Sequence, residues 1–142
     1  MDYIIVFLFS YISGSVPFGL ILTKLFSNQD IRKVGSGNIG ATNVLRTGNK
    51  YLAVTTLLLD ILKGYVPIIL TLKFFPELTQ LSALLVFLGH IFPVWLKFKG
   101  GKGVATYLGI LFALPLPLAI LFIFTWVVVS LIFKFSSLSS MF

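Results

Sequence analysis

The sequence predicts an all-α integral membrane protein, a bundle of membrane-spanning helices, and two observations lead to this fold class. Of its 142 residues, 58% are hydrophobic and only 11% are charged, whereas a soluble domain has about 25% charged residues. The hydrophobic residues also form runs long enough to cross the roughly 30 Å hydrocarbon core of a bilayer as helices. This composition excludes a water-soluble globular domain, a disordered chain and a fibrous repeat.

The first three apolar runs predict membrane spans over residues 3–25, 51–72 and 78–96. Each run has close to the 20 residues that a helix needs to cross the bilayer. The first run is not a cleavable signal peptide, because Asp2 stands where such a signal has basic residues and Pro17 lies well inside the run. Since proline removes a backbone donor, we expect Pro17 to bend the first span.

The remaining apolar stretch, residues 103–133, predicts a hairpin of two spans rather than one helix. A single straight helix of this length would extend about 46 Å, well beyond the bilayer core. Pro115-Leu-Pro117 lies in the middle of the stretch and is typical of a turn. We therefore expect spans over 103–114 and 118–133, and a single membrane domain of five spans over residues 1–142.

The net charge of +7 is concentrated in loops that a five-span topology places on one side of the membrane. These basic residues are Lys24, Arg32, Lys33, Arg46, Lys50, Lys97, Lys99, Lys102 and Lys134. The opposite side carries only Asp2, Lys73 and Glu77. Because Lys and Arg are enriched in cytoplasmic loops, we expect the N-terminus outside and the loops 26–50 and 97–102 in the cytoplasm. There the two loops can meet at one end of the bundle.

The first of these loops contains a glycine pattern, Gly35-Ser-Gly-Asn-Ile-Gly40, that fits the Gly-x-Gly-x-x-Gly signature of dinucleotide-binding domains. That signature requires a preceding strand, whereas a membrane helix precedes this loop, so a dinucleotide site is excluded. The glycines still allow close approach to a ligand, and Arg32, Lys33 and Arg46 add positive charge. Spacing alone leaves two interpretations open, a phosphate-binding loop and a glycine-rich connector with cytoplasmic basic residues.

The second loop, Phe98-Lys-Gly-Gly-Lys-Gly-Val-Ala-Thr106, is similar to the phosphate-binding loop of nucleotide triphosphatases. Gly103 follows Lys102 where that motif requires Ser or Thr, and no strand leads into the loop, so a triphosphatase is excluded. A lysine between glycines at a helix start can contact an anion. The alternative is a basic cluster that marks the cytoplasmic interface of the membrane.

Three ionisable residues in the interior of the predicted spans are candidates for a structural or chemical role. Asp60 and Lys63 are three residues apart on one helical face, and we expect them to form an ion pair, because a lone buried charge is costly. A role near the reaction centre is the alternative for this pair. His90 is a candidate general base, with a hydrogen-bonded packing role as the alternative. The chain has no Cys, one His and four acidic residues, so we expect no metal site and no cofactor. Its basic residues lie in membrane loops, so we expect no nucleic-acid partner.

Four segments together are similar to the bacterial acyl-phosphate:glycerol-3-phosphate acyltransferase (PlsY) family. They are Ser13-Gly-Ser-Val-Pro-Phe-Gly19, Gly35-Ser-Gly-Asn-Ile-Gly-Ala-Thr-Asn43, Gly89-His-Ile-Phe-Pro93 and Phe98-Lys-Gly-Gly-Lys-Gly-Val-Ala-Thr106. The resemblance implies a multi-pass protein of the bacterial inner membrane with a site facing the cytoplasm. It also implies transfer of an acyl group from acyl phosphate to glycerol 3-phosphate, giving lysophosphatidic acid and phosphate. Membrane lipid is the surrounding partner, and no protein partner is implied.

The resemblance also implies which residues bind the substrates. The expected substrate-binding residues are Ser36, Gly37, Asn38, Gly40, Thr42, Asn43, Arg46, Lys102 and Ser140, with Ser137 as a neighbour of the last. No protein nucleophile is implied, because acyl phosphate already carries a good leaving group. The proton of the attacking hydroxyl goes either to a substrate phosphate oxygen or to His90.

The chain departs from the family pattern in one respect. The pattern has seven spans and a third cytoplasmic motif with a His and an Asn, whereas residues 1–142 correspond to the first five spans. We therefore expect a truncated family member. Two alternatives stay open, an inactive fragment of the family and a small membrane transporter or scaffold.

Overall fold

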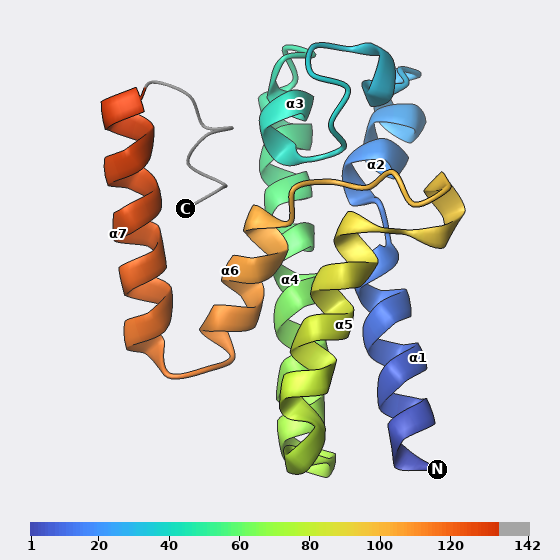
Figure 1. Ribbon diagram of the computed structural model, residues 1–142. Helices are drawn as coiled ribbons and strands as arrows, with labels where there is room; N and C mark the ends of the chain where they lie inside the picture. Colours follow the sequence, from blue (N-terminus) through green and yellow to red (C-terminus); the bar gives the residue numbers. More distant parts are fainter. Residues whose placement is uncertain (134–142) are drawn as a thin grey trace.

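A computed structural model describes residues 1–133 of the chain, and it is helical throughout (Figure 1). Its seven α-helices and three short 3-10 helices, labelled η, follow one another without a strand in these residues. In order they are α1 (Asp2–Ser15), α2 (Phe18–Ser27), η1 (Ile31–Lys33), α3 (Ala41–Leu45), α4 (Lys50–Phe74), η2 (Pro76–Leu78), α5 (Thr79–Ile91), η3 (Val94–Leu96), α6 (Val104–Phe112) and α7 (Leu116–Phe133).

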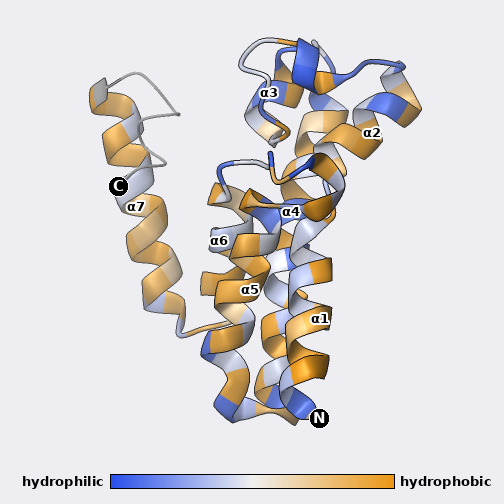
Figure 2. Ribbon diagram, turned by 45° about the vertical axis from the view of Figure 1, so that its right-hand side comes forward, coloured by the Kyte–Doolittle hydropathy of each residue, from blue (hydrophilic) through white to orange (hydrophobic). Residues whose placement is uncertain are grey.

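Helices α1, α4, α5 and α6 form the body of the molecule, with α1 packed along α5 and α4 packed along α6 (Figure 1). Helix α7 packs against α6 at the side of this body. The N-terminus lies at one end of the bundle, and the segments around α2, η1 and α3 lie at the other. Apolar residues run along the helices, and hydrophilic residues concentrate around the α2–α3 end (Figure 2). An apolar exterior of this kind is typical of a helical membrane protein, so the predicted fold class is confirmed.

The lengths of the helices bear on the predicted number of spans. Two segments are long and apolar enough to cross a membrane, Lys50–Phe74 and Pro76–Leu96, and the bent pair α1 and α2 gives a third if it is counted as one span. Helix α6 has nine residues, or about 14 Å at 1.5 Å per residue, which is less than half of the bilayer core. The count of five spans therefore stays a prediction.

The expected bend at Pro17 is confirmed. Helix α1 ends at Ser15, Val16 is extended, and α2 begins at Phe18 with its axis turned by 42°. A turn between residues 103 and 133 is present, but it covers residues 113–115 rather than Pro115-Leu-Pro117, because α6 ends at Phe112 and α7 begins at Leu116. Pro117 lies in the first turn of α7, where a missing backbone N–H costs no hydrogen bond. A further proline, Pro67, lies inside α4 without ending that helix.

Glycines bring two pairs of helices into backbone contact. A Cβ atom on Gly14 of α1 would overlap the carbonyl group of Val86 of α5, and one on Gly89 would overlap the carbonyl oxygen of Tyr11. In the same way, Gly64 of α4 faces the carbonyl oxygen of Thr106 of α6. Contacts of this closeness need residues without a side chain, and they fix α1 against α5 and α4 against α6.

The predicted ion pair inside α4 is confirmed. Lys63 Nζ lies 2.7 Å from Asp60 Oδ1, and both side chains are 4% exposed. The carboxylate oxygen is close enough for an ion pair but is not aligned for a hydrogen bond. Lys63 Nζ also donates a hydrogen bond of 2.7 Å to the carbonyl oxygen of Val16, at the break between α1 and α2. The pair therefore joins α4 to the bend of the first apolar segment.

Candidate active site

Two glycine-rich loops are held together at one end of the bundle. We call residues 35–46 the first glycine loop and residues 97–103 the second glycine loop. Buried apolar side chains at the base of the first loop form a cluster that includes Ile31, Ile39 and Val44, and Leu96 of η3 packs against this cluster. Because Leu96 directly precedes the second loop, this contact places the two loops next to each other.

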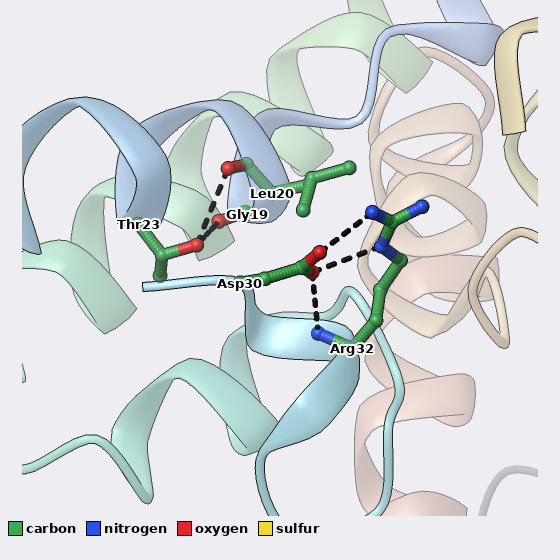
Figure 3. A network of polar contacts seen from close by, with 5 residues as sticks. All are labelled: Gly19, Leu20, Thr23, Asp30 and Arg32. Atoms are coloured by element: carbon green, nitrogen blue, oxygen red, sulfur yellow. Dashed lines mark hydrogen bonds and ion pairs between the residues drawn. The ribbon is translucent and has the colours of Figure 1, made fainter. Parts of the chain in front are cut away.

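An ion pair closes the turn that leads into the first loop (Figure 3). The Arg32 guanidinium donates two hydrogen bonds to the Asp30 carboxylate, of 2.9 and 2.6 Å, and the backbone N–H of Arg32 donates a third of 3.1 Å. This guanidinium holds the pKa of Asp30 well below its usual range. Before the turn, Thr23 Oγ1 donates to the carbonyl oxygen of Gly19 within α2.

Asn43 organises the first glycine loop from inside. Its side chain is 1% exposed, and its Nδ2 lies 3.1, 2.9 and 2.8 Å from the carbonyl oxygens of Ile31, Val34 and Asn38. Its Oδ1 accepts a hydrogen bond of 3.1 Å from the backbone N–H of Ser36. All the hydrogen-bonding atoms of this amide are thus used by the backbone of residues 31–38, which supports a role in shaping the loop rather than in touching a ligand.

Glycines provide the turns of the loop that other residues would strain. Gly35 and Gly37 have φ values of +53° and +71°, in the left-handed region that glycine tolerates best. A Cβ on Gly35 would also lie 2.7 Å from Arg46 Cδ, so the arginine side chain folds across this glycine. Directly after these glycines, Asn38 Oδ1 accepts a hydrogen bond of 2.9 Å from the backbone N–H of Gly40.

The predicted substrate-binding residues of the first loop therefore fall into two groups. Asn38 and Asn43 hydrogen-bond to the loop backbone, whereas Ser36, Thr42 and Arg46 have exposed side chains at its surface. Gly19, next to the helix break, allows the first loop to pack directly against α2, because a Cβ at this position would overlap the carbonyl oxygen of Ile39. Sequence analysis noted no role for Gly19 in the site, although it lies in the first of the four family segments.

The second glycine loop is folded back onto the end of α5. The N–H of Gly100 donates to the carbonyl oxygen of Ile91 at 2.9 Å, and the N–H of Gly101 donates to that of His90 at 3.1 Å. Lys97, Phe98 and Gly103 all have positive φ values, of 53°, 62° and 81°. Lys102 has an exposed side chain and lies two residues before the first residue of α6.

His90 lies under the second loop. It is 4% exposed, and its Nδ1 lies 2.9 Å from Thr106 Oγ1 in the first turn of α6. Sequence analysis did not assign Thr106 a role, because no spacing rule connects residues of two helices across a loop. Nearby, Trp95 Nε1 donates a hydrogen bond of 2.8 Å to Ser15 Oγ, which ties η3 to the end of α1.

Ser140 and its neighbour Ser137 lie outside the described residues. Within residues 1–133 no group of three or more His, Cys, Asp or Glu side chains could hold a metal ion.

The sequence is similar to those of known proteins over almost its whole length. A sequence profile described as glycerol-3-phosphate acyltransferase matches residues 4–142. The chain belongs to the glycerol-3-phosphate acyltransferase family. A protein of that name from Pelagibacter ubique is 58% identical over 141 residues, covering 99% of this chain and 74% of the relative. The acyltransferase of Bartonella henselae is 57% identical, covering 96% of this chain and 67% of the relative.

Solved structures of the glycerol-3-phosphate acyltransferase family have the same fold. A crystal structure of PlsY (YgiH), an integral membrane glycerol 3-phosphate acyltransferase, in its glycerol 3-phosphate form matches with a TM-score of 0.90 and 39% identity. It covers 99% of this chain and 71% of that protein. The lysophosphatidic acid form matches with a TM-score of 0.87 and 37% identity, covering 99% of this chain and 70% of that protein. The predicted family is thus confirmed.

Proposed function

We propose that this acyltransferase uses acyl phosphate as its donor and transfers the acyl group to the hydroxyl of glycerol 3-phosphate, giving lysophosphatidic acid and phosphate. The acceptor and product correspond to the two forms in which PlsY was crystallised. The observation that carries the proposal is the pairing of two glycine-rich basic loops at the hydrophilic end of an apolar bundle. A reaction between two phosphate-bearing molecules, one of them a lipid, suits such a place.

Both loops have exposed basic side chains, and the ones that we assign to a substrate phosphate are Arg46 from the first and Lys102 from the second. A guanidinium can hold a phosphate through two hydrogen bonds, and an ammonium acts as a compact positive charge. Ser36 and Thr42, which are also exposed, add hydroxyl donors on the same loop as Arg46. Asn43 holds the first loop in the shape that presents these groups.

The chemistry requires positioning and charge stabilisation rather than a protein nucleophile. The hydroxyl oxygen of glycerol 3-phosphate attacks the acyl carbonyl carbon, a new ester C–O bond forms, and the bond from that carbon to the phosphate oxygen breaks. Phosphate leaves with the bonding electron pair and takes up the proton of the attacking hydroxyl. Arg46 and Lys102 would stabilise the negative charge that develops on the leaving phosphate.

The proposed location is the bacterial inner membrane, with the N-terminus outside and both glycine loops on the cytoplasmic side. The basic loops lie at the end of the bundle opposite Asp2, which agrees with the tendency of basic residues to face the cytoplasm. In this orientation the acyl chain remains in the bilayer while glycerol 3-phosphate enters from water.

The test is an assay of purified chain in detergent with acyl phosphate and radiolabelled glycerol 3-phosphate, with phosphate and lysophosphatidic acid measured as products. We expect phosphate release that depends on glycerol 3-phosphate, with one lysophosphatidic acid formed per phosphate. Arg46→Gln and Lys102→Met should each lower transfer on the order of 10²-fold, as the loss of one group that stabilises transition-state charge typically does.

Lys73→Met is the matched control, because Lys73 is an exposed lysine in the last turn of α4, near η2 rather than near the glycine loops. It should transfer at the wild-type rate. Wild-type transfer by both loop variants would refute the assignment of the site, and transfer from acyl-CoA but not from acyl phosphate would refute the donor.

A further inference from the structure

We propose that His90 is a positioning residue that fixes the backbone on both sides of Lys102, and that it is not the base of the reaction. The proposal rests on the proposed function, because it gives Lys102 a substrate phosphate to bind. It starts from one observation: the two hydrogen-bonding contacts of His90 fall on residues that flank Lys102 in the chain.

The first contact is on the N-terminal side of Lys102. The carbonyl oxygen of His90 accepts a hydrogen bond of 3.1 Å from the N–H of Gly101, and the carbonyl oxygen of Ile91 accepts one of 2.9 Å from Gly100. The second contact is on the C-terminal side, where Nδ1 of the imidazole lies 2.9 Å from Thr106 Oγ1. One residue at the end of α5 therefore contacts both ends of the six-residue segment 101–106.

The packing around His90 leaves no room for a substrate at the ring. A Cβ on Gly101 would overlap Nε2 of the imidazole, and a Cβ on Gly100 would overlap the carbonyl oxygen of His90. The ring is thus covered by the backbone of the second loop, and His90 is 4% exposed. A general base must come within hydrogen-bond distance of the proton that it removes, and this backbone occupies that position.

Lys102 needs such support because of its neighbours. It stands between Gly101 and Gly103, two residues that restrict the backbone least, and Gly103 already has a positive φ of 81°. A misplacement of about 1 Å in a group that holds a substrate can cost on the order of 10²-fold in rate. The contacts of His90 with Gly101 and Thr106 restrict the backbone on both sides of Lys102.

The activity test compares four single variants and one double variant of the full chain in the transfer assay. His90→Leu and Thr106→Val each delete the contact at Nδ1, and we expect each to lower kcat/KM on the order of 10²-fold, mainly through a raised KM for a phosphate-bearing substrate. The double variant should be no worse than either single variant. His90→Asn, which places a polar atom near the Nδ1 position, and Thr106→Ser, which keeps the hydroxyl, should retain most activity and the wild-type pH profile.

If His90 were the general base, the activities of the variants would follow a different pattern. Asn cannot take up a proton at neutral pH, so His90→Asn would then be as inactive as His90→Leu, while Thr106→Val would stay near wild type. That result would overturn the proposal.

Hydrogen exchange of backbone amides in detergent provides a second measurement that needs no turnover. His90→Leu and Thr106→Val should both speed exchange in residues 97–106 and leave residues 35–46 unchanged. Unchanged exchange in residues 97–106 in both variants would overturn the positioning role. If the wild-type protein makes no lysophosphatidic acid but both variants show the expected faster exchange, the proposed function is refuted. The positioning role of His90 in residues 97–106 would then still be supported.

Discussion

Removing the ammonium group of Lys63 is the perturbation whose outcome follows most directly from the structure. Asp60 and Lys63 are both 4% exposed and 2.7 Å apart inside the bundle, so neither charge can reach water. The partners are not equivalent, however. Lys63 has a second oxygen, the Val16 carbonyl at 2.7 Å, whereas Asp60 Oδ1 has no aligned hydrogen bond to replace the ion pair.

This asymmetry gives an order of stabilities. Lys63→Met leaves a buried carboxylate without a cation and should cost about 3–5 kcal/mol, the range for breaking a buried pair. Asp60→Asn leaves Lys63 hydrogen-bonded to Val16 and should cost less, about 1–3 kcal/mol. The double variant removes both of these buried charges, and it should be more stable than Lys63→Met alone.

The measurement is reversible unfolding of the purified protein in mixed micelles by increasing SDS, with helicity followed by circular dichroism. The free energies of the two single variants and the double variant then form a double-mutant cycle. Two results would show the reasoning to be wrong: Asp60→Asn that is less stable than Lys63→Met, or a double variant whose loss equals the sum of the two single losses.

Three further predictions concern the loops and the helix contacts. Asn43→Ala should cost about 2–4 kcal/mol and lower the thermal midpoint, because it leaves the carbonyl oxygens of Ile31, Val34 and Asn38 without their donor. Asn43→Asp keeps the acceptor for the Ser36 N–H, so it should lose less stability than Asn43→Ala only if that one contact dominates. Asp30→Asn should lower thermal stability between pH 5 and 7 but lose this difference as the pH falls below about 4, because a carboxyl with a lowered pKa stabilises the fold above its unfolded value of about 3.9 and stops doing so once protonated in the folded state; a difference that grows toward low pH would contradict the ion pair. Gly14→Ala should destabilise the bundle by about 1–3 kcal/mol through overlap with Val86, whereas Ile12→Ala, on an exposed face of the same helix, should change detergent stability little; equal effects would remove the case for backbone contact at Gly14.

The sequence contained enough information for the fold class, the helix break and the buried pair. Each follows from a local property: hydropathy over about 20 residues, the missing N–H of Pro17, and the three-residue spacing of Asp60 and Lys63. The number of spans is harder to predict from sequence. Hydropathy shows that a segment is apolar, but it does not show whether the helix that forms is long enough to cross the membrane. Helix α6, with nine residues, shows the difference.

The internal structure of the site could not be predicted in the same way. The resemblance to the family selected Asn43 as a binding residue, but its four contacts within the loop depend on how residues 31–43 fold back on themselves. The contact between His90 and Thr106 joins residues on two helices, and no periodic pattern records it. Exposure of Ser36, Thr42 and Arg46 likewise becomes visible only when the loop has a shape.

The glycine contacts between helices also bear on how a lipid reaches the loops. Where Gly14 and Gly89 join α1 to α5, and where Gly64 and Gly109 join α4 to α6, backbone lies against backbone with no space for a methyl group. An acyl chain is at least as wide as a methyl group, so neither of these two interfaces can open a lateral path from the bilayer without separating the helices. The fatty substrate therefore has to approach along another flank of the bundle, and four residues that lack a side chain restrict the direction of its entry.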